Sequence, residues 1–164
     1  MFREDILSDE AETNKCLFLV ADEAIFRKLV NYNKQYPEVL PMLGQFHTNR
    51  EMLIVLISAF SGYGIFNLAA KLGTKFLDKL DNVVDYRATC RTIELLWVAV
   101  GIAIHLYMNK KELSANDIME GDNDILKVWY LFYQWAGYWK GHKVGIRTGN
   151  FEIFSSICTI ISSN

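Results

Sequence analysis

Two short apolar runs flank an amphipathic segment in the first third of the chain. The runs cover residues 16–21 and 39–46, and between them apolar residues recur at helical spacing over 23–36 until Pro37 stops the pattern. The first run is continuous, which is typical of a strand buried on both faces. The second run is interrupted by Pro41 and Gly44 and is also expected to be a strand, with a proline that suits an edge strand or a strand start. Strand, helix and strand with so long a connection form a parallel unit, so a βαβ element is expected over 16–48.

The hydrophobic period turns helical after residue 48. The pattern predicts a helix over 49–72 that bends at Ser61–Gly64, and a long apolar helix over 86–109. An aromatic-rich helix is expected over 122–140, followed by a basic loop over 141–150. Smaller predicted elements are a helix over 75–80, a turn capped by Ser114 or Asn116, and a final helix over 151–161.

These elements predict a fold between α/β and mainly α. Residues 1–15 read as an acidic flexible lead-in, and residues 16–164 as a single domain. Within that domain, the βαβ element at 16–48 precedes a helical region at 49–140, and a basic loop with a C-terminal helix fills 141–164.

Composition excludes several classes of protein. Of 164 residues, 51% are hydrophobic, which excludes disorder throughout, and a net charge of -2 gives no global attraction to nucleic acid or anionic lipid. Cys16, Cys90 and Cys158 are far apart and never form a CxxC pair, so neither a disulfide framework nor a zinc site is indicated. A reducing, intracellular location is expected.

Two uncharged stretches leave a membrane alternative open. Met52–Ala70 is long enough to span a bilayer, and Leu95–Met108 is a shorter stretch of the same kind. Core helices that are apolar all round explain both stretches equally well. Because the mean hydropathy is only +0.09, we favour the core interpretation and expect no membrane contact, with a small integral membrane protein as the alternative.

Two polar residues stand at the ends of the predicted strands. Asp22 ends the first apolar run and His47 the second, and ligands of open α/β sheets bind at the carboxyl ends of strands. The carboxylate could hold Mg²⁺, and the imidazole could bind a metal or a phosphate. The structural alternative for Asp22 is a helix N-cap, and for His47 a cap or an imidazole bonded to a backbone carbonyl.

Four short motifs carry a resemblance to a known kind of protein. They are Met42–Thr48 (MLGQFHT), Phe60–Ile65 (FSGYGI), Asp85–Ala88 (DYRA) and His142–Glu152 (HKVGIRTGNFE). Together with the strand that ends in Asp22, they resemble the RNase H-like core of Mutator-like transposases. The resemblance over residues 20–155 is closer to uncharacterised transposon-associated proteins of animals and fungi, known only as a domain of unknown function.

The resemblance implies Mg²⁺-dependent cleavage or strand transfer on DNA as the ancestral chemistry. Asp22 matches the second catalytic carboxylate and a metal ligand, Glu152 is the candidate third acid and metal ligand, and His47 would orient or bind phosphate. The alternative for Glu152 is a first-turn acid that faces the helix dipole. The hairpin that carries the first acid in such cores has no counterpart, so the resemblance implies a fragment that is inactive alone and binds no Mg²⁺ by itself. It also makes the nucleus a candidate location.

A second cluster of candidate residues follows the aromatic-rich segment. The bases are Lys140, His142, Lys143 and Arg147, and aromatic side chains between bases can stack on nucleobases while the bases hold phosphates. The alternative places the aromatics in the core and the bases on a solvated loop. This cluster supports a second hypothesis, a non-catalytic module that binds nucleic acid or protein. DNA is the candidate partner, and self-association is expected if apolar helix faces are exposed.

Two further arginines lie earlier, on the predicted helix over 86–109. Arg87 and Arg91 are one turn apart and stand near Asp85 and Glu94 in the sequence. This spacing favours a set of ion pairs on the helix surface over a phosphate clamp.

Overall fold

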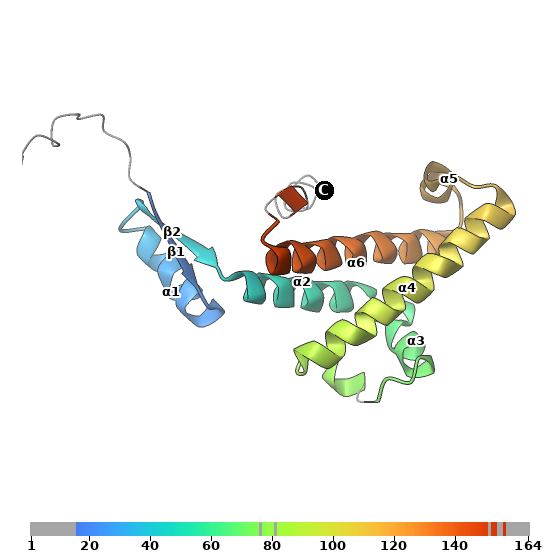
Figure 1. Ribbon diagram of the computed structural model, residues 1–164, viewed down its shortest axis with the longest axis horizontal. Helices are drawn as coiled ribbons and strands as arrows, with labels where there is room; N and C mark the ends of the chain where they lie inside the picture. The colour runs from blue at the N-terminus through green and yellow to red at the C-terminus, as the bar shows by residue number, and fades with distance from the viewer. Residues whose placement is uncertain (1–15, 76, 81, 151, 154–155, 157–164) are drawn as a thin grey trace, which may run out of the picture. The chain divides into compact units, whose positions relative to one another are not determined.

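The computed structural model describes residues 16–75, 77–80, 82–150, 152–153 and 156. The chain divides into two compact units, Met1–His47 and Thr48–Asn164, and each is described by itself. Most of the described elements are helices, and the described strands all belong to the N-terminal unit (Figure 1).

The N-terminal unit contains the predicted βαβ element. Strand β1 (Leu17–Ala21) and strand β2 (Val39–Leu43) pair in parallel, and helix α1 (Glu23–Asn33) connects them. The register runs from Leu17 beside Val39 to Ala21 beside Leu43. The parallel βαβ prediction is therefore confirmed, although the second strand is shorter than the predicted 39–46 because helix α2 already begins at Gln45.

Among the described residues of the N-terminal unit, the first strand is not buried on both faces, contrary to expectation. Phe18 and Val20 are 62% and 67% exposed, whereas Leu19 and Ala21, on the other face, are partly buried. A single crossover helix covers only one face of a two-stranded sheet, and α1 is the helix that packs on these strands. The apolar run predicts the strand correctly. It does not predict how many faces of the strand are covered.

The second unit is helical. It holds most of α2 (Gln45–Phe60), which begins in the N-terminal unit, and the helices α3 (Ile65–Lys71), α4 (Tyr86–Lys111), α5 (Ala115–Glu120) and α6 (Asp124–Thr148). The predicted bend falls between α2 and α3, where a 3₁₀ turn at Ser61–Tyr63 precedes Gly64. Gly64 has φ +90°, a left-handed conformation that favours glycine, and the chain changes direction there by 92°. The predicted helix over 75–80 is reduced to a 3₁₀ turn at Leu77–Lys79.

Helices α2 and α6 lie side by side and run in opposite directions, and α4 crosses them (Figure 1). The ring of Phe60 at the end of α2 meets Phe132 of α6 edge to face, with centroids 5.4 Å apart. Gly101 lets α4 approach α6 closely, since a Cβ there would lie 2.6 Å from the Tyr133 ring. The fully buried core side chains include Leu53, Ile57, Ile93, Leu96, Phe132 and Trp139. The interpretation of Phe132 and Trp139 as core residues is thus confirmed.

Helix α6 corrects the sequence prediction at its C-terminal end. It continues to Thr148 and ends at Gly149 with φ +65°, so residues 141–148 form the last turns of a helix and not a loop. Trp139, His142 and Lys143 are buried against other helices, and these contacts hold the segment helical despite its glycines. Most of the predicted final helix over 151–161 lies outside the described residues; residues 152–153 and 156 are helical.

One described helix, α4, is long and apolar enough to cross a membrane. In its most apolar window 44% of the residues are buried inside the protein, and core helices of soluble proteins pass the same criterion. The α2 and α3 segments pass only if they are taken together across their 92° bend. The length and composition of these helices therefore do not decide between a core helix and a membrane-spanning helix.

Candidate functional site

Asp22 directly follows β1 and caps helix α1. Its Oδ1 accepts a hydrogen bond from the backbone N of Ile25 at 2.9 Å, which is the N-cap geometry. His47 is not at a strand end, because β2 stops at Leu43 and His47 lies in the first turn of α2. Its ring meets Phe46 edge to face with centroids 5.5 Å apart.

Glu152 belongs to the second unit, whereas Asp22 belongs to the first. Glu152 is exposed, and its backbone N donates to the Oδ1 of Asn150 at 3.1 Å. Among the residues that the structure describes, no three His, Cys, Asp or Glu side chains are placed to hold a metal ion together. The described residues thus supply single carboxylates and no group of three metal ligands.

Two of the predicted DNA-binding lysines are tied to an acid of α4. Lys140 and Lys143 donate to the same Oε1 of Glu94, at 2.7 and 2.9 Å. The Lys143 side chain is only 11% exposed, and its ammonium lies 5.1 Å from the centroid of the Trp139 ring. Burial acts to raise the pKa of the Glu94 carboxyl, but the two lysines outweigh it and the pKa is lowered. These lysines therefore join α4 to α6, and they do not form a solvated basic loop.

His142 is buried beside a polar cluster that links three helices. Asn49 of α2 accepts hydrogen bonds through its Oδ1 from the Tyr86 hydroxyl at 2.5 Å and from Nε1 of Trp139 at 3.0 Å. Its Nδ2 lies 3.0 Å from Nδ1 of His142 and 3.4 Å from the Trp139 carbonyl oxygen. The cluster joins α2, the start of α4 and the end of α6.

The partners in this cluster indicate which ring nitrogen of His142 accepts a hydrogen bond. An indole N–H only donates, so the atom of Asn49 that faces Trp139 Nε1 must be the amide oxygen. The amide nitrogen then donates to Nδ1 of His142, which must carry no proton. Burial lowers the pKa of His142, which agrees with a neutral ring protonated at Nε2. Because His142 is only 1% exposed, it packs inside this cluster and does not lie on a surface that a phosphate can reach.

Three arginines at the same end of the helical unit are exposed: Arg87, Arg91 and Arg147. The expected ion pairs of Arg87 and Arg91 are absent from the described part of the chain, because both candidate acids are occupied. Asp85 caps α4 by accepting from the N of Ala88 at 3.0 Å, and Glu94 binds the two lysines. Burial raises the pKa of the Tyr86 hydroxyl, and the Arg147 guanidinium opposes that shift in part, so Arg147 lies near the start of α4.

A row of large apolar side chains faces outward on α4. Leu95, Val98, Ile102 and Leu106 are between 52% and 66% exposed and recur at helical spacing. The sequence predicts a helix here that is apolar all round. The pattern therefore does not show that one side of α4 is buried and the other is exposed.

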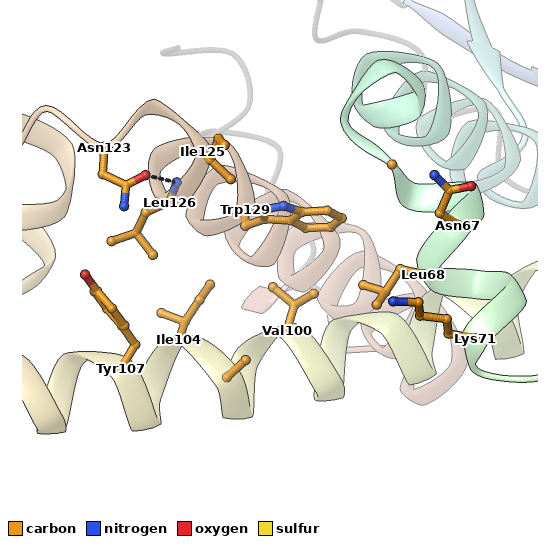
Figure 2. Close-up of a pocket in the computed structure, with 12 residues that line it drawn as sticks. Asn67, Leu68, Lys71, Val100, Ile104, Tyr107, Asn123, Ile125, Leu126 and Trp129 are labelled. Atoms are coloured by element: carbon orange, nitrogen blue, oxygen red, sulfur yellow. Dashed lines mark hydrogen bonds between the residues drawn. The ribbon is translucent and has the colours of Figure 1, made fainter.

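A cleft of about 540 Å³ opens between α3, α4 and the start of α6 (Figure 2). Its floor is apolar, and the only charged side chain among its described lining residues is Lys71. No motif of the sequence indicated it, because its lining residues are scattered over three helices.

Comparison with known proteins gives no match to a family model, to a curated protein or to a solved structure.

Proposed function

We propose that this chain is a transposase-derived protein that contacts DNA through its helical unit and does not cleave DNA on its own. The observation that carries the proposal is the group of exposed arginines, Arg87, Arg91 and Arg147, at the end where α4 begins and α6 ends. None of the three has an ion pair among the described residues.

Guanidinium groups suit this role better than the lysines that the sequence pattern singled out. A guanidinium is planar, stays charged at every working pH and presents paired donors to a phosphate. Lys140 and Lys143 share the single carboxylate of Glu94, so one of their two positive charges is balanced inside the protein and both ammonium groups are held there. Phosphate contacts of this kind give affinity without sequence selectivity.

The RNase H-like origin is supported by the place of Asp22. It follows the first of two parallel strands, and the carboxyl ends of such strands are where ligands of α/β sheets bind. A two-metal reaction needs several carboxylates around the ions, and Asp22 is one. The ancestral Mg²⁺ chemistry, with Asp22 and Glu152 as ligands, and a nuclear location remain parts of this proposal.

The main test is the affinity for a DNA duplex, measured by fluorescence anisotropy in low salt. A triple variant, Arg87→Gln, Arg91→Gln and Arg147→Gln, should bind at least about tenfold more weakly, because a phosphate that is no longer neutralised keeps its counterion. The matched control replaces the exposed Lys34, Lys110 and Lys111 by glutamine and changes the net charge equally. Equal decreases in affinity for the two triple variants would show that only net charge matters and would reject the arginine surface.

The absence of catalysis by the chain alone has its own test. Supercoiled DNA incubated with the protein and Mg²⁺ or Mn²⁺ should stay intact. Nicking that disappears in the Asp22→Asn variant would show an active nuclease and overturn this part of the proposal.

The exposed row on α4 favours a second candidate function, self-association. Four large apolar side chains are exposed along this one face of α4. A contiguous exposed apolar patch on a protein often marks a surface that binds another protein. Light scattering should show a larger mass for the unchanged chain than for an Ile102→Lys variant, whose charge sits in the middle of the row. A monomer at every concentration would exclude this candidate.

A further inference from the structure

The cleft beside α4 combines an apolar floor with one cation at its edge. Val100 and Ile104 of α4, Leu126 and Trp129 of α6, and Leu68 of α3 form the floor. Figure 2 shows these side chains converging from the three helices, with the Trp129 ring over the middle. The volume of about 540 Å³ is in the range of small-molecule sites.

Lys71 supplies the only charge among the described residues that line this cleft. It lies in the last turn of α3, and its ammonium makes neither an ion pair nor a hydrogen bond with the described residues. Figure 2 shows the Lys71 side chain at the same end of the cleft as Asn67 and Leu68, among the residues that line it. Asn67, which directly precedes Leu68 on α3, adds an amide at the same end.

The opposite end of the cleft carries polar groups but no charge from the described part of the chain. Asn123 is the N-cap of α6, and its Oδ1 accepts from the N of Leu126 at 3.0 Å. The hydroxyl of Tyr107 is the other polar group there. None of the described lining residues is an acid, so Lys71 supplies the charged partner of the lining and favours an anionic group at its end of the cleft.

We propose that this cleft binds a small amphiphilic monocarboxylate, a medium-chain fatty acid in its chemistry, with the carboxylate on Lys71 and the alkyl chain on the apolar floor. A lone ammonium at the edge of an apolar surface matches one monoanion followed by hydrocarbon. The floor along α4 from Val100 to Tyr107 is about 10 Å long at 1.5 Å per residue, which suits a chain of roughly eight to ten carbons. This site is independent of the DNA contact proposed above.

The test is a calorimetric titration of the full chain with decanoate, kept below the concentration at which the acid forms micelles. We expect saturable binding at one site, and binding of decanol, which has the same chain but no charge, at least about tenfold weaker. The Lys71→Met variant should bind decanoate about tenfold more weakly and decanol almost as before. Lys110→Met, an exposed lysine of α4 outside the lining, is the matched control and should bind as the unchanged protein does.

Three results would overturn the proposal. They are equal affinities for decanoate and decanol, an unchanged affinity in Lys71→Met, and binding that falls as protein concentration rises, which would show that a second copy fills the cleft. The comparison of the two ligands uses the unchanged protein, so it decides the matter even if the Lys71 variant does not fold.

Discussion

Replacing Asn49 by leucine should destabilise the helical unit strongly, although the two side chains have the same branched arrangement of heavy atoms. Asn49 is 2% exposed, and its Oδ1 is the acceptor for both Trp139 Nε1 and the Tyr86 hydroxyl. Leucine keeps the branched shape and leaves no cavity, but its methyl groups cannot approach the two donors as closely as a hydrogen-bonded oxygen does, so the decrease in stability contains a packing cost besides the lost polar contacts.

The magnitude follows from the burial of the two donors. Trp139 is 1% exposed, and a buried donor left without an acceptor costs about 1 to 3 kcal/mol. The Tyr86 hydroxyl is only partly buried and should cost about 1 kcal/mol, since water can replace its partner. With the removal of the bond to His142, the expected decrease in the free energy of unfolding is about 3 kcal/mol.

The assay is urea unfolding followed by circular dichroism at pH 7. The control is Asn109→Leu, at an exposed position of α4, which should change stability by less than about 0.5 kcal/mol. A decrease below about 1 kcal/mol for Asn49→Leu, or one equal to that of the control, would refute the role of the cluster as a link between the three helices.

Three further variants test other parts of the structure. Gly101→Ala should lower stability by about 1 to 2 kcal/mol in thermal unfolding because the new Cβ meets the Tyr133 ring at 2.6 Å, whereas Gly62→Ala, with nothing within 4 Å, should be neutral. Burial lowers the pKa of His142, so near and below pH 6.5 the unfolded chain binds more protons than the folded chain. The free energy of unfolding should therefore fall from pH 7 to pH 5, and the His142→Gln variant should show a smaller fall. Glu94→Gln should lower the free energy of unfolding by about 1 to 3 kcal/mol, because Lys140 and Lys143 lose their acidic partner. At low salt the same variant should bind DNA more strongly, since the two lysines are released. Weaker DNA binding would contradict the structural role of Glu94.

The hydrophobic pattern predicts the order of elements well and their ends less well. The parallel pair β1 and β2, the bend before Gly64 and the Ser114 cap of α5 all follow from local signals that the structure contains. The end of α6 does not, since its glycines and bases are typical of a loop. What makes it a helix is contact with Asn49 and Glu94, which are far away in the sequence.

The candidate site is less accessible to sequence reasoning than the fold. The sequence allows Asp22 to be a metal ligand or a helix cap, and the structure shows the cap and no set of three ligands among the described residues. In the sequence, Lys143 and Arg147 are equally good candidates for binding a phosphate. In the structure, Lys143 is buried and paired with Glu94, whereas Arg147 is exposed. Ion pairs between different helices decide which basic side chains are available to bind a phosphate. These pairs join residues far apart in the sequence, so the hydrophobic and charge pattern does not predict them.

The dependence of DNA affinity on salt tests the central claim most directly. If Arg87, Arg91 and Arg147 each neutralise one phosphate of a duplex, the logarithm of the binding constant should fall with the logarithm of salt concentration with a slope of about -2.7. The triple glutamine variant should show a slope near zero. No binding by the unchanged chain at low salt, or the same slope in the variant, would contradict the claim that this end of the helical unit contacts DNA.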